Sequence, residues 1–311
     1  MTTIGVLGLG LIGGSVALAA QRAGYAVLGW DTDRATRDAA AEAGLGVTED
    51  FSTASLVVLA IPLPDLTGRL SDTLGDLHLA ADATITDVGS VKVPVAAAMR
   101  SAGLAERYVG GHPMAGTERS GFRAADPTLF TGARWALCVT DGETEMARWL
   151  GVAALATHLG GQVLAVTPAE HDAAMGVVSG LPHLLALALA ASAVRSGPLV
   201  PELAAGSFAD LTRVAGSHPT LLRAVTEDNE PAVRAALRQV LAQIDRPWAD
   251  LVEAGHAARA QLTGPGDARP AITEATVTGA QDLLELGWSG AVIEAVDPDA
   301  GKVWHRGPGS R

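Results

Sequence analysis

A glycine-rich turn near the N-terminus constrains the fold of this chain more than any other feature. The turn Gly8 to Gly13 directly follows the apolar stretch 4–7 and is followed by a helical pattern. A buried strand, a turn without side chains and a closely packed helix together present backbone N–H groups to a pyrophosphate. The pattern therefore predicts a dinucleotide site, with these residues as the cofactor contacts: Gly8, Gly10, Leu11, Ile12 and Gly13.

Asp31 is the predicted contact for the adenosine end of the dinucleotide. It closes the apolar strand 26–30 and lies 23 residues after Gly8. An acid about 20 residues after the first glycine typically bonds the ribose hydroxyls. Its carboxylate would repel a 2′-phosphate, so the sequence favours NAD over NADP.

Composition indicates a two-domain enzyme that acts on a small molecule. With 311 residues and a typical domain of about 150, two domains are expected. The net charge of −12 argues against nucleic acid or an anionic membrane as partner, and an anionic substrate would need local Arg or His. Cys138 is the single cysteine, which excludes an internal disulfide, and the eight histidines show no metal-ligand spacing.

We also expect a cytoplasmic location. The N-terminus enters the first strand without a charged leader, and a single cysteine suits a reducing compartment.

Residues 1–167 read as a Rossmann-type, doubly wound α/β domain that binds NAD. Strands are predicted at 4–7, 26–30, 56–61 and 84–87, with helices between them. Two more strands, 135–140 and 162–166, flank a helix at 143–159. We expect these two strands to extend the same sheet.

Residues 168–262 read as an all-α substrate and dimerisation domain. Breaks between helices are expected near 180–182, 197–201, 216–219 and 229–231. The apolar run 176–194 is interrupted by Pro182 and His183, so it favours a buried interface helix over a membrane span. Helices with long uncharged faces predict a homodimer.

The last part, residues 263–311, reads as a linker followed by a short extension. The linker is 263–270, a helix is expected at 272–286, and a hairpin is expected over 291–305.

Two polar residues next to predicted strand ends are candidates for catalysis. Ser90 follows the strand 84–87, where its hydroxyl could lie beside the nicotinamide or could simply cap the next helix. His112 follows the strand 108–110 and is expected in a stiff loop of small residues. A neutral imidazole there could accept a proton, although a lone histidine often only satisfies a backbone group.

Two residues of the helical part are candidates for holding an anionic substrate. His183 lies at the start of the apolar helix, where a carboxylate would meet both an imidazole and a helix N-terminus. Arg213 could grip a carboxylate through two parallel hydrogen bonds, or could form an ordinary surface ion pair with Asp210.

Five segments resemble the prephenate/arogenate dehydrogenase family of tyrosine biosynthesis. They are GLGLIGGS at 8–15, TDVGSVK at 86–92, GGHPMAGTE at 110–118, SGLPH at 179–183 and FADLTRVAGSHP at 208–219. The resemblance covers about residues 3 to 262. It implies NAD-dependent oxidative decarboxylation of prephenate to 4-hydroxyphenylpyruvate, or of arogenate to tyrosine, by a homodimer.

The resemblance also assigns roles. His112 matches the residue that takes the proton of the ring hydroxyl, and Ser90 matches the serine that orients it. Arg213 matches the arginine that binds the ring carboxylate, and His183 a histidine near the substrate side chain. Thr117 and Glu118 match polar residues that line the pocket.

Some positions depart from the family pattern. Ala209 stands where several relatives have lysine, Gly180 where a histidine is frequent, and Leu222 where some relatives have a tryptophan that reaches across the dimer. These differences concern substrate access and feedback by tyrosine rather than the chemistry.

Alternatives remain open at this stage. A β-hydroxyacid dehydrogenase or imine reductase would share the nucleotide domain, but no lysine occurs between Val93 and Gly301. A regulatory protein that binds NAD without catalysis is the alternative from a different functional class. Of the two substrates, His183 favours prephenate.

Overall fold

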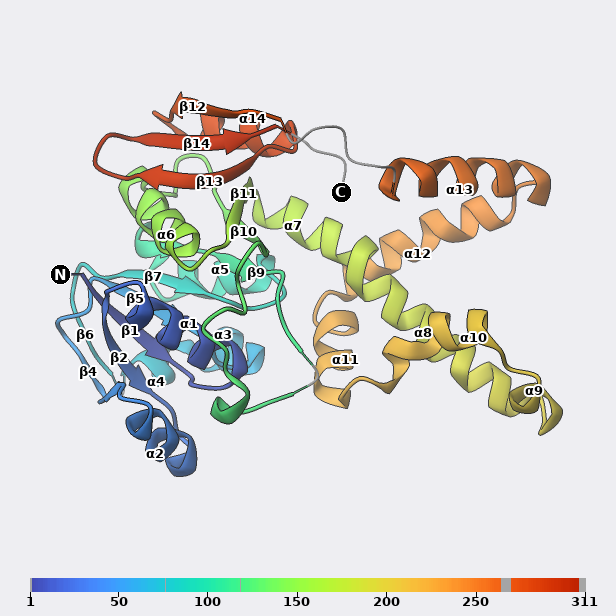
Figure 1. Ribbon diagram of the computed structural model, residues 1–311, viewed down its shortest axis with the longest axis horizontal. Helices are drawn as coiled ribbons and strands as arrows, with labels where there is room; N and C mark the ends of the chain where they lie inside the picture. Colours follow the sequence, from blue (N-terminus) through green and yellow to red (C-terminus); the bar gives the residue numbers. More distant parts are fainter. Residues whose placement is uncertain (1, 76, 118, 264–269, 308–311) are drawn as a thin grey trace. The chain divides into compact units, whose positions relative to one another are not determined.

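The computed structural model describes residues 2–75, 77–117, 119–263 and 270–307 (Figure 1). The chain forms two compact units. One comprises Met1–Pro168 together with Pro265–Arg311, and the other comprises Ala169–Gly264. The C-terminal segment therefore belongs to the same unit as the N-terminal half.

The first unit is built on a six-stranded parallel sheet in the order β3-β2-β1-β5-β7-β8. Its strands are β1 (Thr3–Leu7), β2 (Ala26–Trp30), β3 (Gly46–Val47), β5 (Leu56–Leu59), β7 (Thr84–Asp87) and β8 (Tyr108–Val109). The strand order reverses at β1, which is the place where ligands bind in doubly wound sheets. The predicted fold class is confirmed.

Alternate residues of these strands face two apolar cores, because side chains along a strand point to opposite faces. Ile4 and Val6 of β1 join one cluster, and Leu7 joins the other. The covering helices are α1 (Leu11–Arg22), α2 (Arg34–Glu42), α3 (Leu63–Gly68), α4 (Leu70–Gly75) and α5 (Val93–Ser101), with 3-10 turns at Ala105–Arg107 and Phe122–Ala124. A small parallel pair, β4 (Asp50–Phe51) and β6 (His78–Leu79), lies apart from the main sheet.

The strands expected to extend the first sheet instead form a second one, in the order β12-β14-β13-β11-β10-β9. Here β9 (Gly111–Pro113) pairs antiparallel with β10 (Arg134–Cys138), which pairs parallel with β11 (Gln162–Val166). Helix α6 (Met146–His158) connects the last two strands. The prediction of one continuous sheet is wrong because an apolar run identifies a strand but not its partner.

The C-terminal extension completes this second sheet. It contributes β12 (Ile272–Thr276), α14 (Ala280–Trp288), β13 (Val292–Asp297) and β14 (Lys302–Arg306), and β13 pairs with β11 through Ile293 and Val163 (Figure 1, red). The predicted hairpin is present, but residues 272–276 form a strand rather than the start of a helix. The five residues 272–276 are too few for a strand period to be distinguished from a helical one in the sequence.

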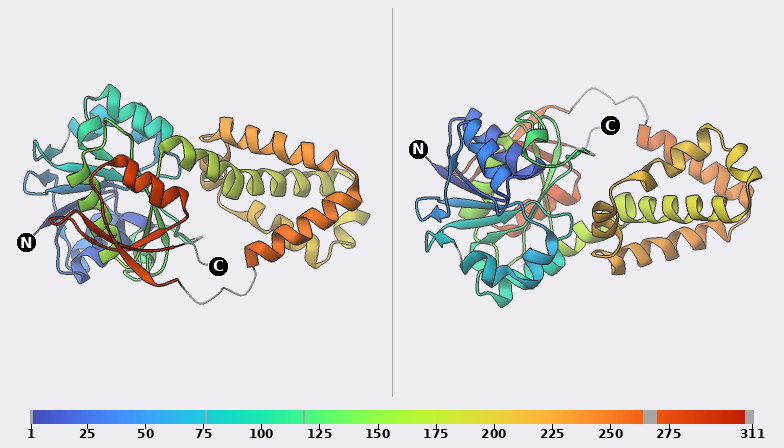
Figure 2. Two further views of the ribbon diagram at one scale, coloured as in Figure 1. Left: turned by 90° about the horizontal axis from the view of Figure 1, so that it is seen from above. Right: turned by 90° about the horizontal axis from the view of Figure 1, so that it is seen from below.

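The second unit consists of helices. They are α7 (Pro168–Met175), α8 (Leu181–Arg195), α9 (Leu199–Glu202), α10 (Gly206–Thr212), α11 (Pro219–Thr226), α12 (Glu230–Ile244) and α13 (Trp248–Thr263), with a 3-10 turn at Arg213–Gly216. Helix α8 contacts α10, α11 and α12 of this unit, which Figure 2 shows from two opposite sides.

The break expected at 180–182 does not occur, because α7 and α8 are joined by a π-helical turn, Gly176–Gly180. Pro182 cannot donate a hydrogen bond to the preceding turn, and the wider turn lets the helix continue past it. A side chain at Gly180 would overlap Val233 of α12 and approach the Val225 carbonyl to 2.6 Å. Close packing against α12 therefore explains why this position holds glycine.

The continuous helix Pro168–Arg195 is long and apolar enough to cross a bilayer, judged by length and composition alone. Little of it is buried within the chain. Exposed apolar side chains include Val178, Leu185 and Leu189, which recur at helical spacing along one side. This stripe leaves an apolar face that a partner could cover.

Candidate active site

The predicted cofactor turn has the geometry that a pyrophosphate requires. Gly8 has a φ of +89°, and a side chain there would overlap the Ala60 carbonyl. A side chain at Gly13 would overlap the Gly8 carbonyl, whereas a Cβ on Gly10 would meet no atom within 4 Å. The first and third glycines thus close the turn, and the second leaves open space at the start of α1.

Asp31 stands at the end of β2 and is held by the backbone. One carboxylate oxygen accepts the N–H of Leu9 at 2.7 Å, and the other accepts the N–H of Asp33 at 2.9 Å. The carboxylate is thereby fixed beside the glycine turn, and each oxygen keeps a lone pair for a ribose hydroxyl. These residues fit the adenosine half of NAD.

The side chains of Arg37 and Asp33 lie at the same end of the sheet as Asp31. Arg37 donates to the carbonyls of Asp31 and Thr32 at 2.7 and 3.0 Å, and its guanidinium lies 4.4 Å from the centre of the Trp30 ring. Asp33 caps α2, and hydrogen bonds from the Thr36 hydroxyl and N–H lower its pKa. The charge of Asp33 is therefore maintained next to Asp31.

Ser90 and His112 belong to the first unit and are both half-buried. Ser90 lies between β7 and α5, as predicted, but the alternative prediction that it caps this helix is wrong, because the N-cap residue of α5 is Lys92. His112 is the middle residue of β9, opposite Ala136 of β10, so the prediction that it stands in a loop is wrong. The run of small residues around it indicated a loop, but pairing with β10 makes this segment a strand.

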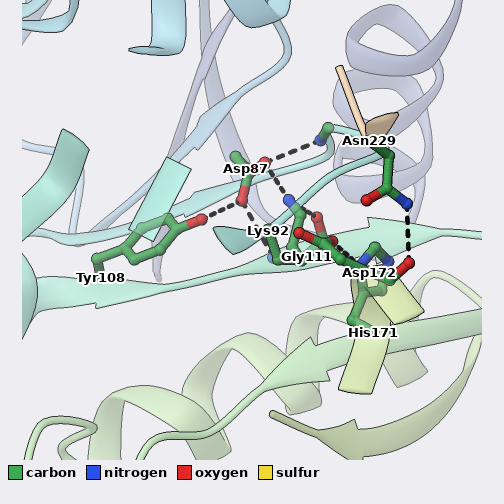
Figure 3. Close-up of polar contacts among 8 residues, drawn as sticks. Asp87, Lys92, Tyr108, Gly111, His171, Asp172 and Asn229 are labelled. Atoms are coloured by element: carbon green, nitrogen blue, oxygen red, sulfur yellow. Dashed lines mark hydrogen bonds and ion pairs between the residues drawn. The ribbon is translucent and has the colours of Figure 1, made fainter. Parts of the chain in front are cut away.

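A buried polar group that contacts Gly89 and Gly111, the residues before Ser90 and His112, was not predicted from the sequence. Asp87 forms an ion pair with Lys92 and accepts the Tyr108 hydroxyl at 2.6 Å (Figure 3). Asp87 and Lys92 are both fully buried. One signal was available: Asp87 ends a fully buried strand, and Lys92 is one of two lysines in the chain.

The other predicted site residues belong to different parts of the chain. His183 lies in the first turn of α8, where its Nδ1 is 2.8 Å from the Ser179 carbonyl. Because a carbonyl only accepts, Nδ1 carries the hydrogen and Nε2 is left to face other groups. Arg213 is exposed, and none of the ion pairs among the described residues joins it to Asp210. Thr117 is exposed, and Glu118 lies outside the described residues.

A second buried polar group occurs within the helical unit. The Nδ1 of His171 is 2.7 Å from the Asp172 carboxylate, and the side-chain amide of Asn229 donates to the Asp172 carbonyl at 2.8 Å (Figure 3). These bonds connect α7 to the start of α12. Helix α7 is part of the same continuous helix that carries His183.

Together, the doubly wound sheet, the glycine turn and Asp31 define a dinucleotide-binding protein whose site fits NAD. Comparison with known proteins identifies the family. Residues 16–173 match the model of the prephenate dehydrogenase nucleotide-binding domain, and residues 167–257 match that of the prephenate dehydrogenase dimerization domain. The chain belongs to the prephenate dehydrogenase family.

Individual relatives agree with this assignment. The prephenate dehydrogenase of Bacillus subtilis is 34% identical over 260 residues, which cover 78% of this chain and 68% of that protein. The structure of Aquifex aeolicus prephenate dehydrogenase with hydroxyphenyl propionate and NAD+ is similar with a TM-score of 0.74 and 29% identity, covering 83% of this chain and 96% of that one. Synechocystis arogenate dehydrogenase gives a TM-score of 0.70 and 30% identity, covering 83% and 94%.

Proposed function

We propose that this protein catalyses the NAD-dependent oxidative decarboxylation of prephenate to 4-hydroxyphenylpyruvate in tyrosine biosynthesis. The observation that carries the proposal is the match of both domains to one family whose members use this chemistry. His112, Ser90, His183 and Arg213 are all present at the corresponding motifs.

In this proposal His112 is the proton acceptor. Its imidazole takes the proton of the substrate's ring hydroxyl while a hydride leaves the carbon that bears this hydroxyl. Ser90 orients the imidazole and the substrate. A neutral imidazole suits this role because its ordinary pKa of about 6.5 lies close to working pH. NAD, when bound, accepts the hydride.

Arg213 holds the ring carboxylate in this account. The carbon–carboxylate bond breaks, its electron pair enters the ring, and CO2 leaves as the ring becomes aromatic. The charge that Arg213 contacts thus disappears during the step. The contact of Arg213 with the carboxylate therefore contributes mainly to binding and orientation of the substrate rather than to stabilisation of the transition state.

His183 is assigned to the side-chain end of the substrate, and Thr117 and Glu118 to the lining of the pocket. Because Nδ1 donates to the Ser179 carbonyl, Nε2 donates to the keto group of prephenate when the ring is protonated, and accepts a hydrogen bond when the ring is neutral. Arogenate, which carries an ammonium there, is the second candidate. The similarity to Synechocystis arogenate dehydrogenase favours including it.

We further propose that the helical unit forms a homodimer in the cytoplasm. The match to a dimerization domain supports this proposal, as does the apolar stripe of Val178, Leu185 and Leu189 on the continuous helix Pro168–Arg195. Glu170 and Asp172 near the start of the same long helix favour a protein partner over lipid as its surroundings.

The test compares prephenate and arogenate at saturating NAD. Initial rates of NADH formation are measured over a range of each substrate with the same enzyme preparation. We expect a higher kcat/KM for prephenate. A higher kcat/KM for arogenate would reassign the substrate, and no NADH from either would reject the function.

A further inference from the structure

The starting observation is the hydrogen bonding of β9, the strand that carries His112. Cys138 donates to the Gly110 carbonyl at 2.8 Å, and Met114 donates to the Arg134 carbonyl at 2.7 Å. In an antiparallel pair, residues alternate between bonding the partner strand and facing away from it. The N–H and C=O of Gly111 therefore point away from β10.

Two side chains occupy the place where a further strand would bond Gly111. The Gly111 N–H donates to Asp87 Oδ1 at 3.2 Å, and Lys92 Nζ donates to the Gly111 carbonyl at 2.7 Å (Figure 3). Both backbone groups of the residue before His112 are thus held by one ion pair.

The same ion pair holds the residue before Ser90. The Gly89 N–H donates to Asp87 Oδ2 at 2.9 Å. A Cβ on Gly89 would lie 2.9 Å from that oxygen, and a Cβ on Gly111 would lie 2.6 Å from the Asp87 carbonyl. Both glycines therefore allow the backbone to approach the pair closely.

Stability alone does not account for this arrangement. Removing two charges from water costs several kcal/mol, and apolar replacements of buried ion pairs are often neutral or stabilising. The Asp87 carboxylate instead accepts donors from three segments: the loop after β7, β8 through Tyr108, and β9 through Gly111. Such a pair specifies where these segments lie relative to one another.

We infer that the buried Asp87–Lys92 pair is a positioning device that sets the placement of Ser90 relative to His112. The inference rests on the proposed function for its catalytic consequence, because these are the residues assigned to orient and accept the proton. Asp87, Lys92 and Tyr108 act through the backbone of Gly89 and Gly111. Displacement of a catalytic group by about 1 Å can cost about 10²-fold in rate.

The first test uses Lys92→Met, which keeps the aliphatic stem but removes the charge and the donor to Gly111. We expect kcat to fall by about 10- to 100-fold. The dissociation constant of NAD, measured by fluorescence titration without substrate, is expected to stay at the parent value, because the glycine turn and Asp31 are not touched.

A substrate-independent readout accompanies the kinetics. Backbone amide exchange at Gly89 and Gly111 is followed by NMR in the parent and the variant. We expect faster exchange at these two amides and parent-like exchange in β1 and β2. This measurement does not require turnover, so it decides the structural part even if the parent converts neither prephenate nor arogenate.

The matched control is Arg306→Met, which breaks another ion pair of the same unit. Arg306 pairs with Glu294 at 3.1 Å in the C-terminal sheet and contacts neither Gly89 nor Gly111. We expect it to lower thermal stability but to leave kcat unchanged. This separates positioning from a general loss of stability.

Tyr108→Phe is the second variant and decides the question if Lys92→Met does not fold. It removes one hydrogen bond to Asp87, and we expect a smaller loss of kcat with faster exchange at Gly111. Parent-level kcat in the folded variants would contradict the inference. A loss of kcat with parent-level exchange at both glycines would also contradict it, because the backbone would then have stayed in place.

Discussion

The two units differ in how far they bury their own apolar residues. The first unit contains both large apolar clusters, with fully buried residues such as Ile4, Leu59 and Trp149. The helical unit contributes to neither cluster, and it exposes large apolar residues such as Val194 and Leu203. The first unit has the core of an independent domain, whereas the second exposes apolar surface of the kind that contacts with a partner cover.

The two units also differ in the residues that they contribute to the proposed reaction. The first unit contains the glycine turn and the two residues proposed to act in proton transfer, His112 and Ser90. The second contains His183 and the exposed Arg213, which are proposed to bind the substrate. If this division holds, substitutions in the first unit should change kcat or cofactor choice, and substitutions in the second should change KM or assembly.

The largest effect is expected for His112→Asn. Removing a general base typically costs about 10²- to 10⁴-fold. We expect this loss in kcat with little change in NAD affinity, because His112 lies outside the glycine turn. Steady-state kinetics and NAD titration check it, and a variant that keeps most of the parent kcat would remove His112 from the mechanism.

Arg213→Ala should raise the KM for prephenate with little effect on the KM for NAD. Hydrogen bonds to a charged group contribute about 1.5–3 kcal/mol, which corresponds to about 10- to 150-fold. Arg213→Lys should recover only part of this loss because an ammonium lacks the planar fork. Parent-level KM in the alanine variant would show that Arg213 does not bind the substrate.

Asp31→Ala should change the choice of cofactor. Removing one negative charge near the 2′-position relieves repulsion of the NADP phosphate, and the ratio of kcat/KM for NADP over NAD should rise about 10- to 100-fold. The kcat with saturating NAD should change little. An unchanged ratio would mean that Asp31 does not contact the ribose.

The smallest catalytic effect is expected from a test of the apolar face. Leu189→Glu places a charge on the stripe of α8 and should shift the protein from dimer to monomer in light scattering. Ile272→Glu, at a half-exposed apolar residue of β12 in the first unit, is the matched control and should leave the mass unchanged. A dimeric Leu189→Glu variant would place the interface elsewhere.

Local patterns predicted much of the first unit. The strands 26–30, 84–87 and 162–166 occur at the predicted residues because short apolar runs bounded by turn residues have few alternatives. The glycine turn and Asp31 could be predicted because their spacing is fixed by the dinucleotide. The residues proposed to contact NAD therefore follow from local sequence.

Features that depend on distant partners could not be predicted. The pairing of β13 with β11 joins Ile293 to Val163, and no local pattern records that contact. The strand conformation of His112 depends on β10 in the same way. The Asp87–Lys92 pair was missed because a buried charge is recognised only when its partners from β8 and β9 are known.

The most direct test of the central claim is the stoichiometry of the reaction with limiting prephenate. NADH, CO2 and 4-hydroxyphenylpyruvate are measured in the same reaction, with His112→Asn as the inactive control. The account predicts equal amounts of all three, because hydride transfer and loss of the ring carboxylate belong to one conversion. Release of CO2 without NADH, or NADH without 4-hydroxyphenylpyruvate, would contradict it.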